Sequence, residues 1–141
     1  ASYTTETFDG GVLQIGKADE GDVAFDLPEG HPDEGEDVAA YYLWLFPNMM
    51  FNFYPWGLSV NIVIPVSPTQ CRVLYRGYVE DGNLAEQGAG SVLDTVEDQD
   101  QWVVEAVQRG MGSRAYDRGR YSPTREQGVH HFHRMLSRLH P

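Results

Sequence analysis

The sequence predicts one α+β domain in which an antiparallel β-sheet is followed by two C-terminal helices. Its 141 residues fit a single domain. Up to about residue 80, apolar and polar residues alternate between turn signals, which is typical of antiparallel strands; after residue 90 the apolar residues recur with a helical period. Hydrophobic residues make up 41% and charged residues 22% of the chain, so it can bury a core without disulfide bonds.

Six segments of the first two-thirds are predicted to be strands. These are residues 4–8, 12–15, 41–46, 49–54, 58–66 and 71–79. The first two flank Asp9-Gly10-Gly11, a turn sequence that favours a hairpin. In the fifth, alternate apolar side chains from Val60 to Val66 share one face. The continuous apolar run of residues 41–46 predicts a strand that is buried on both faces.

Two helices are predicted after a Gly-rich connector that ends at Gly90. The first covers residues 91 to about 111 and ends near a pair of glycines. Ser122-Pro123 is the expected start of the second, because serine is a good N-cap and proline suits the first helical position. An apolar stripe along this last helix is formed by Val129, Phe132, Leu136 and Leu139.

Charge is distributed unevenly along the chain, and its formal net value is −11. This balance argues against non-specific binding to nucleic acid or to an anionic membrane, both of which need a basic surface. Residues 19–37 hold nine acids and no base, whereas residues 109–141 hold seven arginines and two acids. The acidic segment is expected to be a solvated loop, with a recruitment site for a basic partner as the alternative.

Cysteine content and hydropathy predict the compartment. The chain has one cysteine, Cys71, which excludes an internal disulfide, a cysteine-based zinc site and a complete iron–sulfur cluster. Its longest apolar run is far too short to span a bilayer, and no signal peptide is visible. We therefore expect a protein of a reducing compartment, the cytoplasm.

One acidic residue lies on the apolar side of the first predicted helix. At ~100° per residue, Asp100 falls within the stripe that contains Val96 and Val103, whereas Asp98 falls on the polar face. A buried, unpaired carboxylate costs several kcal/mol, so Asp100 needs an arginine, a metal ion or a proton. The arginine would be Arg72 or Arg76 of the sheet, and sequence alone leaves these alternatives open.

The remaining candidate sites carry less information. His130, His131 and His133 resemble a ligand cluster, but neighbouring helical residues diverge by ~100°, so solvated or stacking histidines are the better interpretation. The aromatic stretch of residues 41–56 could line a ligand pocket or simply form core.

Several segments, taken in order, are similar to one enzyme family. They are FPNMMFNFYPWGLSVN at residues 46–61, DQWVVEAVQRG at 100–110, SRAY at 113–116, GRYSPTRE at 119–126 and VHHFH at 129–133. Together they resemble the catalytic domain of the α subunit of Rieske non-haem iron oxygenases, in particular the choline- and glycine-betaine-type monooxygenases and the ring-hydroxylating dioxygenases. The resemblance runs from about Tyr41 to Leu139.

This resemblance implies a metal ligand and also an incomplete site. The family holds a mononuclear Fe(II) with two histidines and one aspartate, and the aspartate maps onto Asp100, with Asp98 as the alternative. The family's His-x4-His pair has no counterpart among the five histidines, and the cysteine–histidine pairs of the 2Fe-2S Rieske cluster are also missing. Residues 1–141 are therefore expected to be the C-terminal portion of a catalytic domain, incomplete at the N-terminus and inactive alone.

The resemblance also implies a fold, a reaction and partners. The fold would be a helix-grip of the START or Bet v 1 type. The whole subunit would act as a mono- or dioxygenase that oxidises an aromatic or quaternary-amine substrate with O₂, with electrons from a ferredoxin or reductase, as a homotrimer. The expected walls of the substrate pocket are Leu93, Val96, Val103, Phe51 and Phe53. The alternatives are a metal-free helix-grip module that binds a small molecule and a structural or regulatory subunit with a degenerate site.

Overall fold

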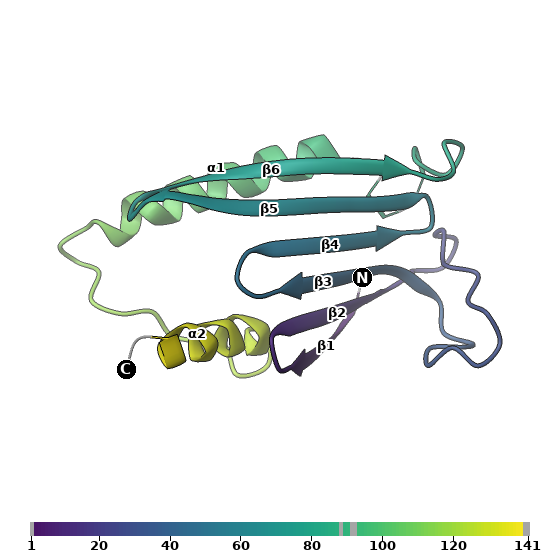
Figure 1. The fold of residues 1–141 in the computed structure, drawn as a ribbon, viewed down its shortest axis with the longest axis horizontal. Helices are drawn as coiled ribbons and strands as arrows, with labels where there is room; N and C mark the ends of the chain where they lie inside the picture. The colour runs from purple at the N-terminus through teal and green to yellow at the C-terminus, as the bar shows by residue number, and fades with distance from the viewer. Residues whose placement is uncertain (1, 88, 91–92, 140–141) are drawn as a thin grey trace.

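The computed structural model describes residues 2–87, 89–90 and 93–139, and it confirms the α+β class. Its strands are β1 (Tyr3–Phe8), β2 (Gly11–Lys17), β3 (Val38–Leu45), β4 (Met49–Tyr54), β5 (Gly57–Ser67) and β6 (Gln70–Val79); its helices are α1 (Leu93–Met111) and α2 (Gln127–Leu139). The strands form one antiparallel sheet in the order of the sequence (Figure 1). Within the described residues, neither helix is long and apolar enough to cross a membrane.

The two faces of this sheet differ in chemistry. One row across the sheet aligns Gln14 with Tyr42, Tyr42 with Asn52 and Asn52 with Ser59, so these side chains share a face. The adjacent row aligns Leu13, Leu43, Phe51 and Val60 on the opposite face. One face is therefore polar and aromatic at its centre, and the other is mainly aliphatic.

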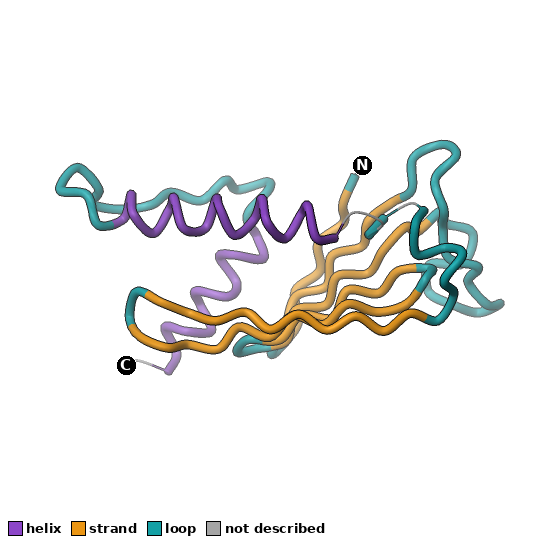
Figure 2. The backbone as a smooth tube through the Cα atoms, turned by 90° about the horizontal axis from the view of Figure 1, so that it is seen from above, coloured by secondary structure: helices purple, strands orange, loops and turns teal. Residues whose placement is uncertain are grey.

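Both helices lie over the polar and aromatic face (Figure 2). Helix α2 packs against β1 and β2, and the ring of its Phe132 meets Trp44 of β3 edge-on at 5.1 Å between centroids. The imidazole Nε2 of His131 lies 2.9 Å from the carbonyl oxygen of Phe8, which ties the same helix to the β1–β2 turn. By contrast, among the described residues no Cα atom of α1 comes within 8 Å of a Cα atom of any strand, so α1 stands off the sheet.

The acidic segment is a loop, as expected, and it folds against the helix-free face. Residues 18–37 contain no strand or helix. Near the end of this loop, the Asp33 carboxylate accepts a hydrogen bond of 2.8 Å from the Tyr41 hydroxyl. The Phe25 ring lies 5.4 Å from the Tyr41 ring. A few inward contacts thus hold the loop while most of its acids remain exposed.

Three local expectations differ from the structure. The aromatic strand is only half-buried over residues 41–45, because the two helices cover one face, and its fully buried part is Val38–Ala40 instead. Helix α2 begins at Gln127 rather than at Ser122-Pro123: the Glu126 carboxylate accepts the Ser122 N–H at 2.5 Å, and a turn precedes the helix. The expected start of α1 at residues 91–92 lies outside the described residues.

Candidate functional site

A groove runs between α1 and the sheet face that the helices cover. Its narrower part is a cavity of about 370 Å³, a size within the usual range for small-molecule sites, ~300–1,000 Å³. On the sheet side, the lining side chains include Gln14, Tyr42, Trp44, Met50, Asn52, Tyr54 and Asn61. On the helix side they are Val96, Glu97 and Asp100. Two carboxylates therefore face an aromatic wall across an open gap.

Asp100 faces the sheet but is not buried. It lines the groove, as the helical pattern predicts, yet its side chain is exposed because α1 stands off the strands. The expectation of burial was therefore wrong. None of the ion pairs within the described residues joins Asp100 to Arg72 or Arg76, and the register places Arg76 opposite Val60 on the helix-free face.

The other predicted pocket residues separate into different places. Val96 lines the groove one turn before Asp100. Val103 does not line either cavity and is 49% exposed. Phe51 and Phe53 lie on the face that carries no helix, since their neighbours Met50, Asn52 and Tyr54 line the groove. The side chain of Leu93 lies outside the described residues.

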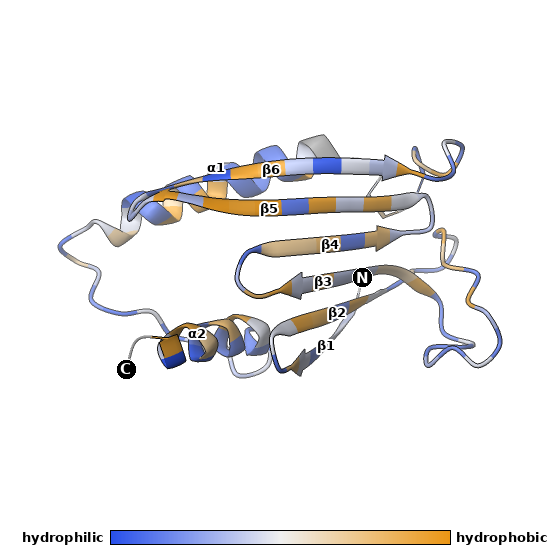
Figure 3. Ribbon diagram, in the orientation of Figure 1, coloured by the Kyte–Doolittle hydropathy of each residue, from blue (hydrophilic) through white to orange (hydrophobic). Residues whose placement is uncertain are grey.

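Sequence reasoning missed three polar groups of the site. Glu97 precedes Asp100 by three positions, so the two share one side of the helix. Asn52 and Asn61 come from β4 and β5, where blue segments interrupt apolar strands in Figure 3. An amide within an otherwise apolar strand is a signal that could have been noticed, because a buried amide needs a partner.

The aromatic wall is a connected set of rings. Tyr54 and Trp56 stack with centroids 5.0 Å apart and planes 7° from parallel, and both side chains are 5% exposed. Tyr42 meets Tyr54 edge-on at 6.0 Å. Burial raises the pKa of both Tyr54 and Tyr42 above the usual tyrosine value, so both hydroxyls are neutral at physiological pH.

The raised pKa of Tyr54 predicts a loss of stability at alkaline pH. The folded state favours the neutral phenol of Tyr54, and this preference stabilises the fold fully at pH values below about 10, the pKa of tyrosine in the unfolded chain. The stabilisation is lost as pH rises above that value and through the higher pKa that Tyr54 has in the folded state. Urea unfolding at pH 8 and at pH 11 should show a smaller alkaline loss in Tyr54→Phe than in the wild type. Tyr78→Phe, at a 60% exposed position, should lose as much as the wild type. Equal losses in all three proteins would contradict this prediction.

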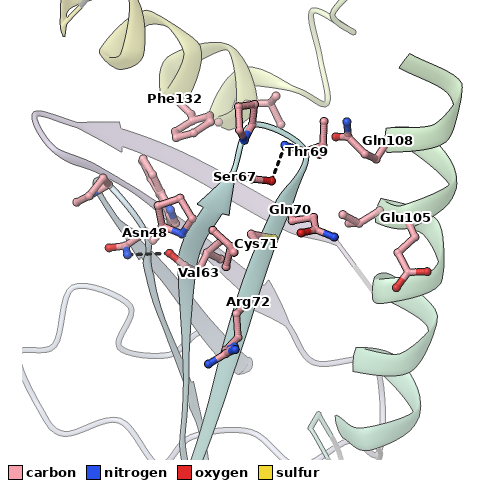
Figure 4. A pocket seen from close by; sticks show the side chains of 18 of the residues that line it. Asn48, Val63, Ser67, Thr69, Gln70, Cys71, Arg72, Glu105, Gln108 and Phe132 are labelled. Atoms are coloured by element: carbon pink, nitrogen blue, oxygen red, sulfur yellow. Dashed lines mark hydrogen bonds between the residues drawn. The ribbon is translucent and has the colours of Figure 1, made fainter. Parts of the chain in front are cut away.

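A second, wider cavity of about 1,280 Å³ adjoins the first toward the β5–β6 turn. Figure 4 shows Gln108 reaching from α1 toward this turn and Phe132 pointing down from α2. Trp44 and Gln14 line both cavities, so the two are parts of one groove. The described structure leaves this wider part open to solvent along the exposed side chains of α1, including Val104 at 61%.

The described histidines do not converge with Asp100. His31 lies in the acidic loop, where its Nδ1 accepts the Asp33 N–H at 3.1 Å. His130 and His133 surround the Tyr121 ring, with His133 hydrogen-bonded to its hydroxyl. Across residues 2–87, 89–90 and 93–139, no three histidine, cysteine, aspartate or glutamate side chains are placed to hold a metal ion. This part of the chain brings no histidine to the two groove carboxylates, Glu97 and Asp100, and does not by itself fit a three-ligand iron site.

Comparison with known families decides the class of protein. Residues 16–140 match the model of the ring-hydroxylating α subunit, catalytic domain. The chain belongs to this family. The resemblance to Rieske oxygenase α subunits that the motifs indicated is thereby confirmed.

Individual members of the oxygenase family show how much of a subunit the chain spans. It is 39% identical over 103 residues to choline monooxygenase, chloroplastic, of Arabidopsis thaliana. The matched segment covers 69% of this chain and 24% of that protein. It is 29% identical over 140 residues to the choline monooxygenase of Beta vulgaris, covering 96% of this chain and 30% of that protein. The carnitine monooxygenase oxygenase subunit of Escherichia coli K12 is 28% identical over 140 residues, 91% of this chain and 36% of its own length. The chain thus spans about a quarter to a third of these relatives.

Proposed function

We propose that this chain is the C-terminal portion of an oxygenase α subunit and supplies one side of a site that oxidises a quaternary-amine substrate with O₂. The observation that carries the proposal is the groove in which Glu97 and Asp100 face Tyr42, Trp44 and Tyr54. A helix-grip arrangement of the complete domain, with the sheet curving around its helices, is part of the same proposal.

The chemistry of the groove favours a cation over a neutral arene. A quaternary ammonium is attracted to the faces of tyrosine and tryptophan rings, by up to ~2 kcal/mol where water is excluded. The two carboxylates add attraction for a positive charge, whereas a neutral aromatic ring would gain only from stacking on the wall. The named relatives include choline and carnitine monooxygenases, which supports the same class of substrate here.

Within this proposal, Asp100 is one protein ligand of the mononuclear Fe(II). It is the carboxylate that the family motif specifies, and it lies on the groove side of α1. The iron, when bound, would supply activation of O₂, and its histidine ligands would come from outside these 141 residues. This chain's own part is to place the carboxylate beside the substrate cavity and to line one side of that cavity with the rings of Tyr42, Trp44 and Tyr54.

Electron supply, assembly and location remain predictions of the same proposal. The 2Fe-2S cluster of the whole subunit would take electrons from a ferredoxin or reductase, and the subunits would form a homotrimer. A cytoplasmic location also remains a prediction, since the plant relatives carry the description chloroplastic.

The proposal is tested by comparing choline with its uncharged isostere, 3,3-dimethylbutan-1-ol, as ligands of the whole oxygenase subunit that contains this chain. We expect choline to bind more tightly, and Glu97→Gln to weaken choline by about five-fold, since two charges near a protein surface attract by ~1 kcal/mol or more. The same substitution should leave binding of the alcohol unchanged. Calorimetry or ligand-observed NMR measures both affinities.

Asp98→Asn is the matched control, because it removes a charge from α1 at a position that lines neither cavity. It should change neither affinity by more than two-fold or so, as expected for a screened charge. Equal binding of the two ligands, or tighter binding of an aromatic carboxylate such as benzoate, would contradict a quaternary-amine site.

A further inference from the structure

Helix α1 lacks the direct packing that normally fixes a helix on a sheet. Among the described residues, none of its Cα atoms lies within 8 Å of a strand or of α2, and several of its large apolar side chains are about half exposed or more, including Val104 and Val107. At its C-terminal end, a link of fifteen residues, 112–126, joins it to α2. The position of α1 over the groove must therefore depend strongly on how its N-terminal end is attached.

Trp56 lies in the turn between β4 and β5. It makes hydrogen bonds to two places in the connector that joins β6 to α1. Its backbone oxygen accepts the N–H groups of Glu80 and Asp81 at 2.9 and 3.2 Å, where the chain leaves β6. Its indole Nε1 donates to the carbonyl oxygen of Ala89 at 3.0 Å, four residues before α1 begins. One residue therefore binds the connector at its beginning and again at Ala89.

The packing around Trp56 strengthens this attachment. Its ring is stacked on Tyr54, and Leu84, Ala85 and Ala89 of the connector pack against the cluster that contains the two rings. Gly90 has a φ of +83°, and a Cβ atom there would lie 2.9 Å from the Trp56 Nε1 atom. Only glycine lets the chain pass this close to the indole in that conformation.

We propose that Trp56 is a positioning residue that sets the height and tilt of α1, and with it the place of Asp100 above the sheet. The attachment of α1 through Trp56 is independent of any metal; only the role of Asp100 as a ligand rests on the proposed function. Asp100 lies seven residues into α1, about 10 Å from its start, so a tilt of about 6° there moves the carboxylate by ~1 Å. A displacement of this size matters, since ligand groups must be held within about 0.5 Å.

The test measures the distance between α1 and the sheet directly. Cys71, the only cysteine, lines the wider cavity and is replaced by serine. Arg76→Cys, on the helix-free face of β6, takes one spin label, and Gln99→Cys on the exposed surface of α1 takes the second. Double electron–electron resonance on the 141-residue chain should give one narrow distance distribution. Trp56→Phe keeps a ring to stack on Tyr54 but removes the N–H donor. It should broaden the distance distribution by about 2 Å, because tilting α1 by about 13° moves residue 99 by about that distance.

Two matched controls and a second variant make the result decisive. Trp102→Phe changes a tryptophan of α1 that is 67% exposed and should leave the distribution as in the wild type. Gly90→Ala should broaden or shift it, whereas Gly82→Ala, in the same connector with no atom within 4 Å of the added Cβ, should not. Circular dichroism checks that each variant is folded. An unchanged distribution in both Trp56→Phe and Gly90→Ala would overturn the proposal. A lack of iron or choline binding would contradict only the proposed function.

Discussion

Replacing Asp100 by alanine in the whole oxygenase subunit should lower its iron content by more than ten-fold or so, because even changes in groups that only orient metal ligands cost about 10–100-fold in affinity. The physical reason is that the carboxylate lies on the side of α1 that faces the groove. Iron is measured by elemental analysis of the purified protein. With iron removed from both proteins, the thermal stability of the variant should equal that of the wild type within a few degrees or so, since Asp100 is exposed and takes part in none of the ion pairs within the described residues.

Asp98→Ala is the matched control for this prediction. Asp98 is also an aspartate of helix α1, but it lines neither cavity. Its substitution should leave the iron content as in the wild type. Equal loss of iron in the two variants would contradict the assignment of Asp100 as the ligand, and loss in Asp98→Ala alone would transfer the role to Asp98.

Replacing Gly57 by alanine should strongly destabilise the sheet, although it adds only one methyl group. Gly57 begins β5 with a φ of +151°, and a Cβ atom there would lie 2.1 Å from the carbonyl oxygen of Tyr78 in the paired strand. Since a rigid backbone atom must move, we expect the free energy of unfolding to fall by about 3 kcal/mol or more. The midpoint of thermal unfolding should fall by about 10 °C.

Gly77→Ala provides the comparison for Gly57→Ala. Gly77 lies in β6, and a Cβ atom there meets nothing within 4 Å. This variant should unfold within a few degrees of the wild type, as surface substitutions usually do. If Gly57→Ala were as stable as Gly77→Ala, the close pairing of the start of β5 with the end of β6 would be incorrect.

The strand pattern was predictable because alternation and turn residues are local signals. The hairpin at Asp9-Gly10-Gly11 and the later strands were located to within a few residues. The side of α1 that carries Asp100 was also predictable, since helical geometry fixes which residues share a face. What these signals lack is the distance between the helix and the sheet, and so the burial of Asp100 was wrongly expected.

Pocket residues depend on pairing between strands, which a single sequence does not display. Phe51 and Phe53 were expected in the pocket because they are large and aromatic, but strand geometry turns their side chains to the face opposite Asn52. The start of α2 also depended on context: Ser122-Pro123 is a good capping sequence, yet the Glu126 side chain bonds back to Ser122 and closes a turn before the helix begins.

The most direct test of Asp100 as an iron ligand is a crystal structure of the iron-loaded oxygenase subunit, with the metal located by anomalous scattering at the iron edge. We expect one iron peak in the groove between α1 and the sheet, within bonding distance of an Asp100 carboxylate oxygen. An iron bound without Asp100, or an Asp100 side chain turned away from the groove and paired with an arginine, would contradict it.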